Sequence, residues 1–182
     1  MLKYNENFKQ YEYNKILLCK NNCLFYNIVN YKNLMFGIYK NTKEKNKYLF
    51  RINLENEKDY LETNNNNILL KKHNILILNE RKFCISGEHE YFIYDNELNL
   101  ITQLKINYNI VYFQKHDNGD IICGGEKGEI FIIENIESGE IVFEDLKSHD
   151  SEINSIIKFK DNQYLSRDKQ NIKLWNLIQE NN

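Results

Sequence analysis

Short apolar runs, rather than long amphipathic ones, recur along the chain. They are rich in Ile, Phe and Tyr and are separated by clusters of Asn, Asp, Gly or Lys, as in "IVYFQKHDNGDIICGG" (residues 110–125). Helical periodicity is nearly absent, and short β-branched or aromatic runs bounded by turn residues are typical of strands. Within this stretch, Asn118-Gly119 supplies the positive φ angles that a tight hairpin needs. The pattern predicts an all-β fold with many short antiparallel strands.

One five-residue pattern, apolar-x-apolar-bulky-polar, returns at a nearly constant interval. "IKLWN" carries Trp175, the single tryptophan of the chain, and "IFIIE" and "YFIYD" place Ile133 and Tyr94 at the same position. A weaker copy, "LFRIN", places Ile52 there, with Arg51 departing from the pattern. The four positions are separated by 42, 39 and 42 residues, which is the length of a four-stranded propeller blade. We therefore predict a β-propeller of about four blades, each a four-stranded antiparallel sheet.

The repeat also predicts blade boundaries. In a single domain over residues 1–182 the blades span roughly 21–72, 73–105, 106–146 and 147–182. The strands expected in the first blade are Cys23–Val29, Leu34–Tyr39, Tyr48–Asn53 and Ile68–Lys72. The last blade lacks a fourth strand, whereas "KILLCK" (Lys15–Lys20) is a spare strand before the first. We expect this N-terminal strand to complete the last blade, so that no sheet edge is left exposed.

Composition and charge argue against some classes of function but do not identify one. The net charge of −2 gives no electrostatic case for nucleic acid. No run approaches the roughly 18 apolar residues of a membrane span, and "MLKYNENFKQ" lacks the apolar run of a signal peptide. We therefore expect an intracellular protein, cytoplasmic or nuclear. Asn is abundant, with 30 residues, while Ala and Pro are absent; we attribute this to AT-rich codons and interpret Asn64–Asn67 as a solvated loop insertion.

The cysteines and histidines do not form a pattern that holds a metal or a cofactor. No cysteine pair has the tight spacing of a zinc knuckle. Cys84 and Cys123 each lie ten residues before a repeat position, Tyr94 and Ile133, so we interpret them as small core residues of equivalent strands. His116, beside the Asn-Gly turn, is interpreted as a solvated turn residue. No metal and no cofactor is expected.

The stretch "KSHDSEINSIIKFKDNQYLSRDKQNIKLWN" (residues 147–176) resembles the WD-repeat (G-beta repeat) family. In that family a histidine, a small hydroxyl residue, an aspartate and a tryptophan form a hydrogen-bonded network that stabilises the blade. The resemblance assigns these structural roles to His149, Ser166, Asp168 and Trp175. Ser148 departs from the usual glycine before the histidine, and Asp168 lies one residue further from the tryptophan than usual. In the other blades, Glu88 and Lys127 occupy the approximate position of the aspartate.

Four blades leave the closure of the ring open. Rings of this family usually have about seven blades, although propellers as a class begin at about four. A small closed ring, an open half-ring, and a half-ring completed by another chain all fit the sequence. In the last case, two copies give eight blades in a homodimer, or another propeller chain supplies the missing blades.

No catalytic arrangement emerges, since the serines and carboxylates around His149 are sequence neighbours rather than convergent triad partners. The resemblance implies a non-enzymatic scaffold or adaptor that binds protein or peptide partners on the propeller rim. A regulatory or substrate-recruiting subunit of an enzyme assembly, and a structural half-propeller completed by a partner chain, are the alternatives. By position, turns before the third strands and the connections into each blade line the rim. The candidate partner-binding residues are His89, Lys127, Asp150, Arg167 and Lys169.

Overall fold

The structure is a computed structural model, and its described part consists entirely of strands and their connections. It describes residues 2–5, 10–13, 22–56, 58–68, 75–116, 119–136, 140–145 and 148–176. Within these ranges there is no helix long and apolar enough to cross a membrane. The predicted all-β class is confirmed.

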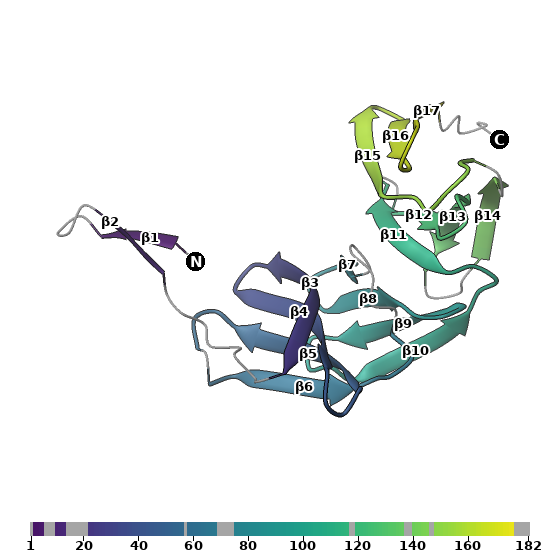
Figure 1. The fold of residues 1–182 in the computed structure, drawn as a ribbon. Coiled ribbons are helices and arrows are strands. Elements are labelled where there is room, and N and C mark those ends of the chain that lie inside the picture. Colours follow the sequence, from purple (N-terminus) through teal and green to yellow (C-terminus); the bar gives the residue numbers. More distant parts are fainter. Residues whose placement is uncertain are drawn as a thin grey trace.

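Four antiparallel sheets follow one another along the chain, and in each sheet the strands pair in sequence order. Figure 1 shows them side by side along an arc, with the first and last sheets at its two ends. A separate hairpin, β1 (Leu2–Asn5) with β2 (Gln10–Tyr13), precedes them and was not predicted. The first sheet contains β3 (Cys23–Tyr31), β4 (Leu34–Asn41), β5 (Lys47–Asn53) and β6 (Tyr60–Asn64). The second contains β7 (Ile75–Ile77), β8 (Lys82–Ser86), β9 (Glu90–Asp95) and β10 (Leu100–Lys105). The third contains β11 (Ile110–Lys115), β12 (Ile121–Gly125), β13 (Ile130–Asn135) and β14 (Glu140–Asp145). The last contains β15 (Ser155–Lys160), β16 (Gln163–Arg167) and β17 (Ile172–Asn176).

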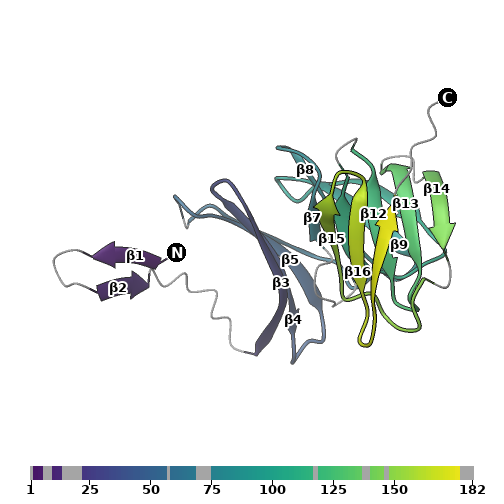
Figure 2. The same ribbon diagram turned by 90° about the horizontal axis from the view of Figure 1, so that it is seen from above.

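The first strands of the sheets form the inner side of the arc. β3 contacts β7, β7 contacts β11, and β11 contacts β15, so each sheet touches the next through its innermost strand. Seen from above, the sheets stand next to one another like the blades of a propeller (Figure 2). The four repeat positions Ile52, Tyr94, Ile133 and Trp175 all lie in third strands, as the spacing predicted.

Apolar clusters fill the spaces between consecutive sheets. Successive side chains of a strand point to opposite faces, and the clusters follow this alternation. Tyr94 packs with Phe36 and Ile38 of the first sheet, whereas its neighbour Ile93 packs with Phe113 and Phe131 of the third. A third cluster joins the third sheet to the last. Each large side chain buried in this way contributes about 1.5–3 kcal/mol, so apolar packing holds the middle sheets together.

The fourth strand of the first sheet was predicted wrongly. The structure places it at β6, which pairs with β5 from Ile52–Tyr60 to Tyr48–Asn64, and not at Ile68–Lys72. A short connection after Asn53 is sufficient for the chain to turn back, and Ile68 forms an isolated bridge with Gly87 of the second sheet instead. The predicted strand Lys15–Lys20 lies outside the described residues.

The two core cysteines are buried as expected, but they are not equivalent. Cys84 and Cys123 are both fully buried in the same cluster between the second and third sheets, so Cys84 faces the sheet that follows and Cys123 the sheet that precedes. The reason is loop length: residues 87–90 separate the paired Ser86 and Tyr91, whereas the longer stretch 125–129 separates Gly124 and Ile130. One extra residue changes the face to which a fixed sequence offset points. Burial raises the pKa of both thiols, which suits packing rather than thiolate chemistry.

Candidate functional site

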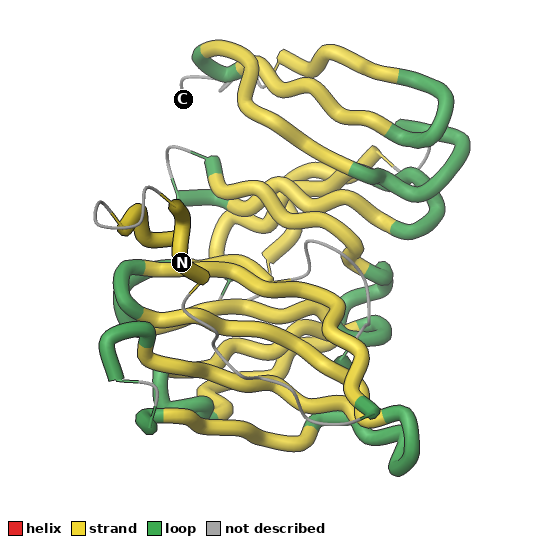
Figure 3. Tube along the Cα trace, turned by 60° about the vertical axis from the view of Figure 1, so that its left-hand side comes forward, coloured by secondary structure: helices red, strands yellow, loops and turns green. Residues whose placement is uncertain are grey.

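Loops gather at two opposite ends of the sheets (Figure 3). At one end, the connections between second and third strands alternate with the connections that lead into the next sheet. We call this end the loop rim and define it by residues 65–68, 87–89, 106–109, 126–129, 148–154 and 168–171. The first five connections hydrogen-bond to one another in chain order, and the fifth bonds to the end of β16 beside the sixth. The bonds are Glu88 N to Asn67 O, Ile106 N to His89 O, Glu126 N to Asn109 O, His149 N to Gly128 O and Asn154 N to Arg167 O, at 2.7–3.4 Å. The loop rim is thus one continuous hydrogen-bonded backbone belt.

Two residues that the sequence reading missed fix this belt. The Asn109 side chain accepts the His89 backbone N–H at 2.9 Å and donates to Glu126 Oε2 at 3.0 Å, bridging two loops. Gly128 has φ of 91°, and a Cβ added there would lie 2.1 Å from the carbonyl oxygen of His149. Only glycine allows this approach, and its place in "EKGE" is the signal that indicates it.

The five candidate partner-binding residues all lie at this end of the propeller. His89, Lys127 and Lys169 lie in turns before third strands, Arg167 ends β16, and Asp150 lies in the connection into the last sheet. All five are exposed to solvent. Their backbones belong to the belt or adjoin it, so their side chains project from fixed positions.

A buried polar network lies in the last sheet directly below the loop rim. Trp175 Nε1 donates to Ser166 Oγ at 2.6 Å, and His149 Nε2 lies 2.6 Å from the same oxygen. His149 Nδ1 lies 3.5 Å from Asp168 Oδ2. The structure therefore brings together all four residues of the expected structural network.

The carboxylate of Asp168 sets the direction of the network. It can only accept, and its Oδ2 lies 3.5 Å from His149 Nδ1, so the imidazole proton lies on Nδ1 and Nε2 accepts. Ser166 Oγ therefore donates to His149 Nε2 and accepts the Trp175 indole N–H. Burial lowers the pKa of His149 below its ordinary value, against the opposing effect of Asp168, so the imidazole is neutral near pH 7.

Asp168 also closes the turn before β17. Its Oδ1 accepts the backbone N–H groups of Asn171 at 2.6 Å and Gln170 at 2.8 Å. The bond from Asn171, followed by that from Gln170, contributes to holding the pKa of Asp168 at about 2. Asp168 therefore remains a carboxylate under all ordinary conditions.

Glu88 and Lys127 were assigned wrongly to the position of this aspartate. The turn bond from Asp168 N to Asn171 O corresponds to Gly87 N to Glu90 O and Gly125 N to Glu129 O, so Gly87 and Gly125 hold that position. A Cβ on Gly125 would meet Glu129 Oε2 at 2.2 Å, and this oxygen accepts the Lys127 N–H at 2.8 Å. In the third sheet a glutamate from the end of the turn thus supplies the carboxylate that Asp168 supplies in the last.

His116 was expected to be solvated, and this expectation was wrong. It is only 7% exposed, and its ring lies 5.4 Å from the ring of Tyr164 in the last sheet. The end of β11 carries it into the space between the third and last sheets, where β11 contacts β15.

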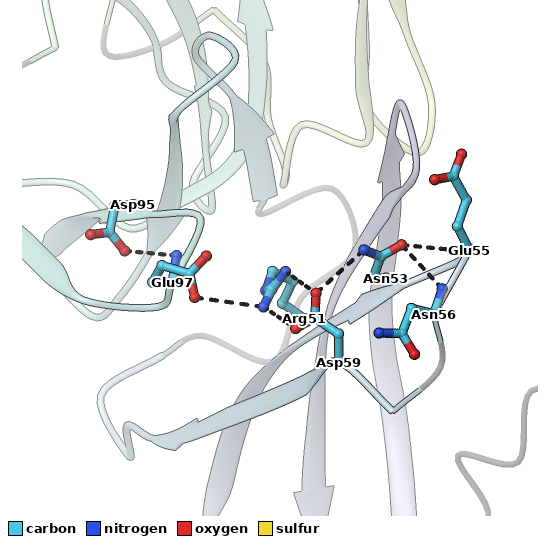
Figure 4. Close-up of polar contacts among 7 residues, drawn as sticks. All are labelled: Arg51, Asn53, Glu55, Asn56, Asp59, Asp95 and Glu97. Atoms are coloured by element: carbon cyan, nitrogen blue, oxygen red, sulfur yellow. Dashed lines mark hydrogen bonds and ion pairs between the residues drawn. The ribbon is translucent and has the colours of Figure 1, made fainter.

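A second polar cluster lies at the end opposite the loop rim, between the first and second sheets (Figure 4). Arg51, only 5% exposed, donates to both carboxylate oxygens of Asp59 at 2.6 and 3.2 Å and lies 3.6 Å from Glu97. The hydrogen bond from Arg51 is the main cause of the lowered pKa of Asp59. This pairing explains why Arg51 departs from the apolar pattern: its two carboxylate partners come from the turns that follow β5 and β9.

The architecture described above has counterparts among solved structures. No protein-family model matches the chain, and no curated protein matches it at a significant level. The chain is similar to a protein in the crystal structure of the mitotic checkpoint complex, with a TM-score of 0.68 and 11% identity over 96% of this chain and 55% of that one. It is also similar to Sqt1 from Chaetomium thermophilum, with a TM-score of 0.60 and 8% identity over 84% of this chain and 42% of that one. A third similar structure is the acylaminoacyl peptidase of Pyrococcus horikoshii, with a TM-score of 0.56 and 11% identity over 84% of this chain and 31% of that one.

At such low identities the likeness concerns the fold. The chain is a β-propeller built from antiparallel blades. It covers 55% of the matched protein in the mitotic checkpoint complex and a smaller share of the other two proteins.

Proposed function

We propose that the chain is a non-enzymatic protein-interaction scaffold of the WD-repeat type, which binds a protein or peptide partner on the loop rim. The observation that carries this proposal is the combination of a fixed backbone and free side chains. The belt of hydrogen bonds orders the loops before any partner arrives, so binding costs little loop ordering. His89, Lys127, Asp150, Arg167 and Lys169 are exposed on it.

The polar network of the last sheet supports the rim rather than a reaction. His149, Ser166 and Asp168 are 3% exposed or less, so no substrate reaches them. Ser166 Oγ bonds to Trp175 and His149, and Asp168 Oδ1 bonds to the turn. By fixing the turn at 168–171, the network orients Arg167 and Lys169. Arg is enriched among residues that dominate binding energy at interfaces, and Arg167 is the residue we assign the largest share.

The fold alone also fits a regulatory or substrate-recruiting part of an enzyme assembly, since one similar structure is a peptidase. Both roles use the same rim contact, and they differ only in what the partner does.

The test compares two exposed arginines at opposite ends of the propeller. Arg167 borders the loop rim, and Arg81 lies in the β7–β8 connection at the other end. Proteins captured by the wild-type chain are identified by mass spectrometry, and capture is repeated with Arg167→Ala and Arg81→Ala. We expect at least a tenfold loss of the main partner with Arg167→Ala and no loss with Arg81→Ala. Equal capture by both variants, with both folded, would remove the rim assignment.

A further inference from the structure

The last sheet exposes a face that is buried in every other sheet. The residue just before each repeat position points to the sheet that follows. Arg51, Ile93 and Ile132 hold this position in the first three sheets and are 5%, 0% and 9% exposed, respectively. Leu174 holds it in the last sheet and is 53% exposed.

Register extends this exposed face across all three strands. Leu174 pairs with Leu165, and Leu165 pairs with Ile157, so the three form one apolar row. Ile157 is 51% exposed, and Ile172, on the same face, is 69% exposed. The opposite row, with Tyr164 and Trp175, packs against the third sheet. We call the row Ile157–Leu165–Leu174 with Ile172 the trailing face.

The first sheet exposes part of a face of the complementary kind, along its innermost strand β3. Ile28 pairs with Gly37, which pairs with Phe50, and Phe25 pairs with Tyr39; these side chains point away from the second sheet. Phe25 and Ile28 are 40% and 49% exposed, and the Phe25 ring stands edge-on to Phe50 at 5.8 Å. Tyr39 and Phe50 lie on the same side but are buried, at 3% and 0% exposed. We call the surface that Phe25 and Ile28 form along β3, above these two side chains, the leading face.

Every sheet–sheet contact within the chain joins a trailing-type face to a leading-type face. This holds between the first and second, second and third, and third and last sheets. The two faces left exposed are one of each type. Cationic side chains, Arg167 and Lys160, lie at strand positions of the trailing side. The leading side carries the Glu62 carboxylate, which pairs with Phe50 in the register and accepts hydrogen bonds from the hydroxyl groups of Tyr39 and Tyr60.

We propose that the trailing face of one chain packs against the leading face of a second copy, and the reverse, so that two arcs form one closed ring of eight sheets. The contact continues the packing used three times inside each chain. It covers apolar side chains that a monomer would expose to water. Twofold pairing of identical chains forms two such contacts and closes the ring, so that neither face remains uncovered. Arg167 borders both the trailing face and the loop rim, so the two proposals are separated by Leu174→Asp, which changes the trailing face and leaves the rim residues unaltered.

The test uses light scattering during size-exclusion chromatography at micromolar concentration, with variants on each face. The wild type is expected at twice the chain mass. Leu174→Asp, on the trailing face, and Ile28→Lys, on the leading face, are each expected at the chain mass. Ile101→Lys is the matched control, because Ile101 is 46% exposed but lies on β10, away from both faces; it is expected to stay dimeric.

Mixing separates this geometry from any other dimer. An equimolar mixture of Leu174→Asp and Ile28→Lys retains one unaltered trailing–leading contact and is expected to return to twice the chain mass. A contact between two trailing faces predicts a monomeric Leu174→Asp but a dimeric Ile28→Lys, and overturns the proposal. A monomeric wild type also overturns it. Circular dichroism verifies folding, and Ile157→Asp replaces Leu174→Asp if the latter does not fold.

Discussion

The third sheet and the last sheet solve the same packing problem with different chemistry. The third sheet is packed on both faces by apolar clusters, with Ile121, Cys123 and Ile133 against the second sheet and Ile122 and Ile132 against the last. The last sheet has apolar cover on one face only, and there it adds the network of His149, Ser166, Asp168 and Trp175. Ser166 and Cys123 hold the same position, each two residues beyond the partner of the repeat residue. The sheet with one covered face is thus stabilised partly by directional hydrogen bonds, whereas the sheet with two covered faces is stabilised by apolar packing.

The largest expected effect comes from removing a ring from each sheet. Phe131→Ala in the third sheet, where Phe131 is fully buried, is expected to lower the free energy of unfolding by about 4 kcal/mol. Trp175→Ala is expected to lower it by about 3 kcal/mol, because its ring is only partly covered. Chemical denaturation measures both. A loss below about 1 kcal/mol for Trp175→Ala would contradict the packing assigned to the last sheet.

A matched serine pair tests whether the hydrogen bonds themselves matter. Ser166→Ala leaves Trp175 Nε1 and His149 Nε2 without their shared oxygen, and it is expected to cost about 2 kcal/mol. Ser86 is just as buried, but its hydroxyl has no hydrogen-bond partner among the residues that the structure describes. Ser86→Ala is therefore expected to be neutral or slightly stabilising. Equal losses for the two variants would show that the network contributes only volume.

The pH dependence of stability gives a smaller effect with a defined sign. Because burial lowers the pKa of His149, the unfolded chain binds a proton at higher pH than the folded chain does. The contribution of His149 is complete above its unfolded pKa of about 6.5 and is lost as pH falls below that value. Thermal melting between pH 7.5 and 5.5 should show a falling melting temperature, and His149→Gln should flatten this dependence. Asp168, with a pKa of about 2, titrates in a separate, more acidic window.

The smallest effect is expected at the loop rim. Arg167→Ala removes an exposed side chain, and exposed substitutions usually change stability by less than about 0.5 kcal/mol. Unchanged melting together with lost partner capture would separate the rim from the network beneath it. A large loss of stability would instead assign Arg167 to the core of the sheet.

The repeat spacing predicted the third strands because their apolar-bulky-polar pattern reflects burial on both faces in the first three sheets. The last sheet keeps the same residue types, although Ile172 and Leu174 are exposed there. The polar residue that ends the pattern also has a physical role: Asn53 Oδ1 and Asp95 Oδ1 accept backbone N–H groups two residues later and begin the next turn. The pattern could not predict which neighbouring sheet Cys84 and Cys123 face, because this depends on one extra residue in the loop after Gly124. It also could not predict that His116 packs on Tyr164, since that contact joins two sheets far apart in sequence.

The rim residues were identified from turn positions, which the strand pattern fixes. The belt that holds them was not visible in the sequence, since each bond joins backbone groups of different loops. Asn109 is an example: one asparagine among 30 carries a bridge between two loops, and nothing in composition separates it from the others. Gly128 was the exception, because a glycine inside a charged turn is itself a signal of a close approach.

The unequal cover of the two faces of the last sheet is tested most directly by hydrogen–deuterium exchange at two protein concentrations. At the higher concentration we expect slower amide exchange in peptides covering β15–β17 and β3–β6, because trailing and leading faces of two chains then cover each other. Peptides covering β12 and β13 should be unaffected, since both faces of their sheet are already packed. Exchange in β15–β17 that is independent of concentration would contradict the account.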